Sequence, residues 1–194
     1  MQGGNYELSD LNYVLDAQHA HMGHVMPMYS ELAANGQVEL TTTPYYHPIM
    51  PLLMMEGWTM EDGIRVNKEA WPEDVQNHLI TGMDLFEQEL GFRPTGMWPS
   101  EEAVSPAMVQ PVTDVGIEWM VTDEEILKQS TDQNGNYIDV EDATNLATPW
   151  KVSGADGGEV AVIFRDRVIS DRIAFQYGTM TPEAAVSDFI AYLD

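Results

Sequence analysis

The sequence predicts an α/β fold in which parallel strands alternate with helices. Two observations carry this prediction. Short β-branched or apolar runs, which are typical of strands, recur at residues 38–43, 95–98, 118–122 and 160–164, and helical patterns lie between them. Because a strand–helix–strand order builds parallel sheets, four such strands in 194 residues predict an open sheet or about half of a closed barrel.

The first predicted helix covers residues 11–35, where apolar positions recur at helical spacing. Ser9 and Asp10 precede it as cap-type residues, and Pro27 predicts a kink. Gly36 follows the last helical residue and predicts a helix end of the usual glycine type.

The prolines that follow the first strand predict a loop over residues 45–50. A second helix is expected to begin at Pro72, with carboxylates in its first turn, and to run to Leu90. Gly91 ends it.

The third predicted helix opens at Pro106 and ends near Gly116. After the strand at 118–122, the acidic residues 123–125 are most simply explained as a solvated helix start with Thr122 as its cap.

The C-terminal third begins with a polar segment, residues 132–142, that predicts a surface loop. The strand at 160–164 and a final helix over 182–193 complete the pattern. No internal repeat or interdomain linker interrupts the sequence, so we expect a single domain over residues 1–194.

The charge balance excludes several classes of partner. The 32 acidic residues against 8 basic ones give a net charge of −24, which argues against nucleic acid and anionic membranes and is compatible with a neutral sugar polymer. We interpret the acidic excess as adaptation to salt. The absence of cysteine excludes disulfides and thiolate metal sites, and no apolar run is long enough to cross a membrane. The sequence predicts a soluble protein, and leaves a cytoplasmic or a secreted location open.

Loops that follow parallel strands form the functional rim of such folds, and here they carry polar and aromatic residues. Tyr45, Tyr46 and His47 follow the first strand and suit a sugar ring, although a proline-braced loop whose tyrosines pack on the barrel explains them too. Trp98 ends the second strand. We treat these four residues as candidate sugar contacts.

Two carboxylates, Glu101 and Glu102, come next and have the position of a catalytic group. The residues alone do not choose between them, and a helix N-terminus would also favour acids here. Arg165, Asp166 and Arg167 bring two of the few cations to the last strand end, where they either orient a carboxylate or form a local ion pair. His19, His21 and His24 lack the spacing of a metal site, so we predict no metal.

Four segments together resemble glycoside hydrolase family 57, in the order in which that family has them. Residues 36–52 are similar to its second conserved region and residues 96–105 to its third. Residues 119–127 and 164–171 resemble segments of its amylopullulanase-like or α-amylase-like branch. The similarity covers roughly residues 11–193.

The resemblance implies part of a distorted (β/α)7 barrel that acts on α-glucans such as starch by a retaining mechanism, without a cofactor. It implies that Glu101 is the nucleophile. We interpret Tyr45, Tyr46, His47 and Trp98 as sugar contacts and Arg165 and Asp166 as residues that orient the carboxylates.

The resemblance also implies that the family's His-Gln-Pro segment would lie before residue 1 and its general acid/base aspartate beyond Asp194. We therefore expect an internal fragment of a catalytic barrel with little hydrolysis by itself, and assign the acid to neither Asp123 nor Asp188. The alternatives are a non-catalytic glucan-binding domain and a metal-dependent polysaccharide deacetylase, for which His47 alone has a suitable place. The preference for α-1,4 or α-1,6 linkages stays open.

Overall fold

The computed structural model describes residues 4–55, 57–59, 63–66, 69–155 and 157–193. Its α-helices are α1 (Leu8–Met22), α2 (Val25–Ala34), α3 (Met50–Met54), α4 (Pro72–Leu90), α5 (Val109–Asp114), α6 (Glu124–Lys128), α7 (Ala143–Ala147), α8 (Arg167–Asp171) and α9 (Pro182–Leu193). Shorter helical turns are η1 (Ser100–Glu102), η2 (Pro106–Met108), the π-helical η3 (Arg172–Gln176) and η4 (Tyr177–Thr179). The strands are β1 (Thr41–Thr42), β2 (Trp58–Thr59), β3 (Arg65–Val66), β4 (Gly96–Met97), β5 (Trp119–Asp123), β6 (Trp150–Ser153) and β7 (Glu159–Arg165).

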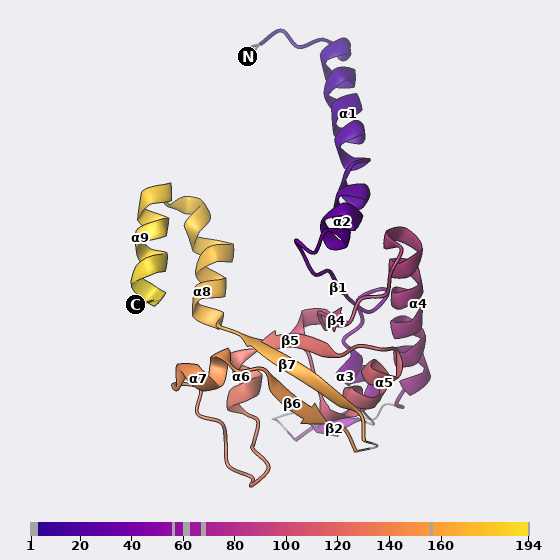
Figure 1. Cartoon of the computed structure of the whole chain (residues 1–194), viewed down its shortest axis with the longest axis vertical. Coiled ribbons are helices and arrows are strands. Elements are labelled where there is room, and N and C mark those ends of the chain that lie inside the picture. Colours follow the sequence, from indigo (N-terminus) through magenta and orange to yellow (C-terminus); the bar gives the residue numbers. More distant parts are fainter. Residues whose placement is uncertain (1–3, 56, 60–62, 67–68, 156, 194) are drawn as a thin grey trace.

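Five of these strands form one sheet in the order β1-β4-β5-β7-β6 (Figure 1). The first four are parallel to one another, with Met97 opposite Met120 and Thr122 opposite Phe164. This confirms the predicted α/β class with parallel strands. Strand β6 pairs antiparallel with β7 at the sheet edge and was not predicted, because it depends on that pairing.

The core is rich in methionine. Flexible thioether side chains fill irregular gaps well, which suits packing between short strands and helices. Helix α4 contributes to the core and contacts α2, α3, α5 and β1. The buried apolar residues form one cluster: Met50, Val75, Leu79, Met83, Met97, Met108, Val109, Val112, Ile117, Met120, Leu127, Val160, Val162 and Phe164.

Helix α4 has the predicted bounds because its ends are set locally. Pro72 occupies the first turn, where a missing N–H costs nothing, and Gly91 closes the helix in the left-handed region at φ 86°. Glycine takes this conformation without a steric penalty.

The prediction of one helix over residues 11–35 was wrong. The structure has two helices that separate at Gly23 and His24, and Pro27 lies in the first turn of α2, where proline is tolerated. Glu7, and not Ser9, caps α1, in a reciprocal capping box with Asp10. The predicted end at Gly36 is confirmed, with φ 67°.

Two further bounds differ from the prediction. Pairing with the two-residue strand β4 limits β1 to Thr41–Thr42, so the predicted strand at 38–43 is mostly extended loop. Helix α6 is capped by the Asp123 side chain and not by Thr122. The cap is an aspartate because β5 continues through Asp123.

Helices α1 and α9 extend away from the sheet (Figure 1). Neither helix has a buried residue, and apolar side chains such as Leu11 and Ile190 are half exposed. Among the helices of the described ranges, none is both long and apolar enough to cross a bilayer.

Candidate active site

The carboxyl ends of β1, β4, β5 and β7 lie side by side, because these strands are adjacent and parallel. The loops that follow them therefore meet at one edge of the sheet. This edge, which we call the rim, holds His47, Glu101, Glu102, Asp123 and Arg165. It is the place where the sequence predicts a site.

The loop after β1 contacts the loop after β4 through His47 and Glu101. The His47 Nε2 atom lies 3.1 Å from Glu101 Oε1, and His47 Nδ1 lies 3.4 Å from Thr43 Oγ1. A carboxylate accepts hydrogen bonds, so this geometry requires an N–H at Nε2. The Glu101 side chain is 70% exposed, which leaves its carboxylate accessible to a ligand.

Both of these loops have backbone in the left-handed region. Tyr46 and His47 have φ 60° and 54°, and Glu101 and Glu102 have φ 55° and 57°. Such a conformation costs about 1–3 kcal/mol for each non-glycine residue and persists where surrounding contacts hold it. The strain is concentrated beside the candidate catalytic carboxylate.

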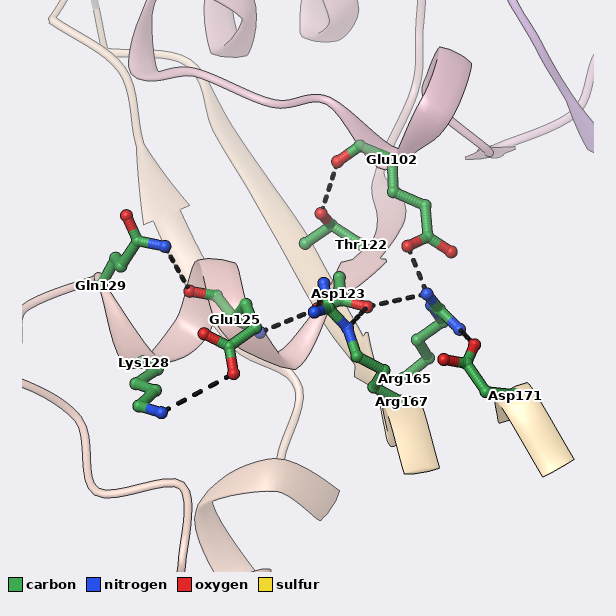
Figure 2. A network of polar contacts seen from close by, with 9 residues as sticks. All are labelled: Glu102, Thr122, Asp123, Glu125, Lys128, Gln129, Arg165, Arg167 and Asp171. Carbon is green, nitrogen blue, oxygen red and sulfur yellow. Dashed lines mark hydrogen bonds and ion pairs between the residues drawn. The ribbon is translucent and has the colours of Figure 1, made fainter. Parts of the chain in front are cut away.

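Glu102 points away from solvent and toward the neighbouring strands (Figure 2). Its carboxylate accepts a 2.8 Å hydrogen bond from Arg165 Nε, and its backbone carbonyl accepts a 2.6 Å hydrogen bond from Thr122 Oγ1. The side chain is 14% exposed, against 70% for Glu101. The two adjacent glutamates thus have different environments.

Asp123 is the most enclosed carboxylate of the rim, with a side chain 7% exposed. Arg167 binds it with two nitrogens, at 2.8 and 3.1 Å, and Arg165 Nη2 binds it at 2.8 Å (Figure 2). Burial favours a higher pKa for Asp123, but hydrogen bonds from the Glu125 N–H and Arg167, together with both guanidinium charges, lower its pKa below the ordinary value. Asp123 is therefore ionised at neutral pH.

Arg165 connects these groups. Besides Glu102 and Asp123, it contacts Asp171 at 3.4 Å, so three carboxylates surround one guanidinium (Figure 2). The side chain is 27% exposed. The pKa of Arg165 is raised: burial opposes the charge, but the bound carboxylates outweigh that effect.

Asp166 makes different contacts. It caps α8 by accepting from the Ile169 N–H at 3.0 Å, and it accepts a 2.7 Å hydrogen bond from the Tyr192 hydroxyl. This hydrogen bond, together with burial and the charge of Asp166, raises the pKa of Tyr192 to about 12. The same charge adds to burial in raising the pKa of Glu124. Asp166 thus connects the rim to α9.

Two aromatic side chains precede His47 in the loop after β1. The rings of Tyr45 and Tyr46 are 4.4 Å apart, and Tyr46 is 83% exposed. Together with His47 they form one wall of a cleft of about 400 Å³, whose other wall belongs to α2 and α4. Trp98 and Glu101 do not line this cleft, which meets the rim at His47.

The structure brings together some of the predicted site residues. His47 meets Glu101, and Arg165 meets Glu102 across 63 residues of sequence. Asp166 is directed to α8 and Tyr192 instead. Sequence reasoning missed the roles of Asp123 and Thr122. The available signal was a pair of arginines, one at the end of β7 and one at the start of α8, together with an acid at the end of β5.

The alternative function, a metal-dependent deacetylase, would need several side chains arranged together as metal ligands. Within the described residues, no group of three or more His, Asp or Glu side chains is arranged to hold a metal ion. Two of the rim carboxylates, those of Glu102 and Asp123, are instead bound by arginines.

Comparison with known proteins adds a family and a fold. The family model for glycosyl hydrolase family 57 matches residues 3–194. No curated protein matches the chain.

Solved structures with a similar fold include three enzymes. The chain is 18% identical to a 4-α-glucanotransferase from Thermococcus litoralis, with a TM-score of 0.58 over 84% of this chain and 21% of that one. It is 16% identical to an α-amylase from Thermotoga maritima (TM-score 0.56, 85% and 27% covered). It is 18% identical to a GH57-type branching enzyme from Pyrococcus horikoshii (TM-score 0.54, 88% and 29% covered). The chain therefore has the fold of part of a (β/α)7 barrel, and it spans less than a third of each of these proteins.

Proposed function

The chain belongs to glycosyl hydrolase family 57, and from this premise we propose that its rim is part of a retaining α-glucan site in which Glu101 is the nucleophile. One observation carries the proposal. An exposed carboxylate lies in the loop after a parallel strand, four residues beyond its last residue, and is hydrogen-bonded to a histidine on the neighbouring strand-end loop. This is the position from which a carboxylate reaches a ligand bound at the rim.

In the proposed reaction a Glu101 oxygen attacks the anomeric carbon, and the bond from that carbon to the leaving oxygen breaks. The leaving oxygen takes a proton from a general acid, and water later hydrolyses the glycosyl-enzyme ester and restores the carboxylate. The exposed rings of Tyr45 and Tyr46, with Trp98 half exposed beyond β4, suit the apolar faces of glucose units. The His47 hydrogen bond orients the nucleophile.

The neighbouring carboxylates do not suit the role of general acid. Asp123 is ionised and bound by two arginines, and the Glu102 carboxylate is bound by Arg165. Ionised Asp123 cannot donate the proton that the leaving oxygen needs, and the Arg165 guanidinium occupies the Glu102 carboxylate. We therefore propose that residues 1–194 by themselves cleave unactivated glucan poorly.

The proposed substrate class is α-glucan, with an amylopullulanase-like or α-amylase-like specificity. Two kinds of support agree. The segments 119–127 and 164–171 resemble that branch of the family, and the structures of similar fold are named as a glucanotransferase, an amylase and a branching enzyme.

A test that needs no general acid uses α-glucosyl fluoride, because fluoride leaves without protonation. We expect residues 1–194 to release fluoride, and we expect Glu101→Gln to lower the rate by at least about 10³-fold, because the nucleophile is lost. Calorimetric binding of maltoheptaose should persist in the variant. Equal fluoride release by both proteins would contradict the assignment.

The second candidate is a glucan-binding domain without catalysis, which the exposed Tyr46 ring favours. The same experiment separates the two. Maltoheptaose binding without fluoride release, in the wild type as well as in Glu101→Gln, would identify a binding domain. Loss of binding in Tyr46→Ala would then locate its surface.

A further inference from the structure

We propose that Glu102 is a positioning residue that fixes the strained turn presenting Glu101 to a ligand. The inference rests on the proposed role of Glu101 as the nucleophile and extends it to a residue for which the family resemblance implies no role. Three observations carry it: the backbone of the turn, the two contacts of Glu102, and the rigidity of the partners.

The turn from Ser100 to Ala103 is tight. The Glu102 N–H donates to the Pro99 carbonyl at 2.9 Å, and the Ala103 N–H donates to the Ser100 carbonyl at 3.1 Å. Glu101 and Glu102 both have positive φ within it. Glycine adopts this conformation freely, whereas two consecutive glutamates need contacts that hold them there.

Glu102 supplies these contacts from both its backbone and its side chain. Its carbonyl is bound by the fully buried Thr122 on β5, and its carboxylate is bound by Arg165 on β7. The residue after the nucleophile is therefore anchored to two neighbouring strands. Glu101 itself remains largely exposed, with its contact to His47.

The anchor is itself fixed. Arg165 is bound by Asp123 and Asp171 as well as by Glu102, and Asp123 is bound in turn by Arg167 (Figure 2). A guanidinium with several carboxylate partners has little freedom to move. The fixed Arg165 guanidinium holds the Glu102 carboxylate in place. Because Glu101 and Glu102 share one short turn, holding Glu102 also restricts the backbone of Glu101.

Three substitutions of Glu102 distinguish the effect of its contact with Arg165 from the effect of its strained backbone. Glu102→Gln keeps an oxygen that accepts from Arg165. Glu102→Ala removes the carboxylate and keeps the strain, whereas Glu102→Gly removes the carboxylate and relieves the strain. Glu87→Ala, which removes an exposed glutamate bound to Arg93, is the matched control.

Two readouts are measured on residues 1–194. The ¹⁵N chemical shift of His47 Nε2 at fixed pH reports the contact with Glu101, and the initial rate of fluoride release from α-glucosyl fluoride reports nucleophilic attack. We expect Glu102→Ala and Glu102→Gly to shift the His47 resonance to its position in Glu101→Gln. We expect the rate at saturating substrate to fall by about 100-fold with KM little changed, because attack depends on geometry. Glu102→Gln should retain most of both readouts, and Glu87→Ala all of them.

The inference is overturned if Glu102→Ala and Glu102→Gly leave the His47 resonance and the rate unchanged. It is also overturned if Glu102→Gly performs as the wild type, because strain and not anchoring would then matter. If the wild type releases no fluoride, the proposed function fails, and the NMR readout still decides the positioning role. Should Glu102→Ala lose cooperative unfolding, Thr122→Val removes the backbone anchor alone and is expected to shift the His47 resonance in the same direction.

Discussion

At the scale of residues, the rim is organised by one cation among many acids. Arg165 binds Glu102, Asp123 and Asp171, although the chain has 8 basic residues for 32 acidic ones. A buried carboxylate is costly without a partner, so the scarce arginines matter most where carboxylates leave solvent. Asp123 and Glu102 are two such carboxylates.

Replacing Arg165 with Met should destabilise the chain by about 3 kcal/mol, the lower end of the range for a broken buried ion pair. The cost arises because Glu102 loses its counter-charge, while Asp123 retains Arg167. The matched control is Arg93→Met. Arg93 also binds two carboxylates, Asp84 and Glu87, but it is exposed, so we expect a loss below about 1 kcal/mol. Urea unfolding of both variants measures the difference, and equal losses would contradict the account.

Sequence patterns predicted site residues whose signal is local and missed those whose partners are distant. Glu101 follows a strand and a proline, which a reader of the sequence can see. The burial of Asp123 depends on Arg167, 44 residues further on, and three adjacent acids look like a solvated helix start until the sheet brings β7 beside β5. The left-handed backbone at Glu102 has no sequence signal, since glycine is the residue that indicates it.

At the scale of elements, α9 is attached to the rest of the chain by polar contacts. It has no buried residue, yet Tyr192 donates to Asp166, and Asp188 accepts from Arg172 at 2.9 Å. The Arg172 guanidinium also lies 5.0 Å from the centre of the Tyr192 ring. These contacts link α9 to the end of β7, where Asp166 follows Arg165.

The Tyr192 contact should give the chain an alkaline limit. The pKa of Tyr192 is raised to about 12 from 10.0, so the native state favours the protonated hydroxyl. The stabilisation is complete below pH 10 and is lost as the pH rises toward 12. In urea unfolding, Tyr192→Phe should be less stable than the wild type at pH 9, and the gap should close by pH 12. A gap that stays constant over this range would contradict the assignment.

Element bounds were predictable where a residue sets them by its own chemistry. Pro72 and Gly91 define α4, and Gly36 ends α2. The break between α1 and α2 lies at Gly23, whereas the sequence pattern predicted a kink at Pro27. Proline is tolerated in the first turn of a helix, so Pro27 fits within α2 and does not mark the break. The unpredicted β6 depends on pairing with β7, which is a property of the assembled sheet.

At the scale of the whole molecule, the charge is the dominant feature. The net charge is −24, so the carboxylates on the surface repel one another, and this repulsion destabilises the compact state. Added salt screens such interactions, with a Debye length that falls from about 30 Å at 0.01 M to about 3 Å at 1 M.

We therefore expect the melting temperature to rise between low and molar sodium chloride. A non-ionic osmolyte at matched osmolality serves as the control, because it strengthens burial without screening charge. Differential scanning calorimetry measures both. A melting temperature that does not rise in salt, or that rises equally in the osmolyte, would contradict the interpretation of the charge as salt adaptation.

The claim on which the other proposals depend is that Glu101 forms a covalent bond to a sugar at the rim. Incubation with 5-fluoro-α-glucosyl fluoride, whose second fluorine slows breakdown of the ester, should leave one glucosyl adduct on the chain, and peptide mapping by mass spectrometry identifies the residue that carries it. The account predicts the adduct on Glu101 and none in Glu101→Gln. An adduct on Glu102 or Asp123, or none on the wild type, would contradict it.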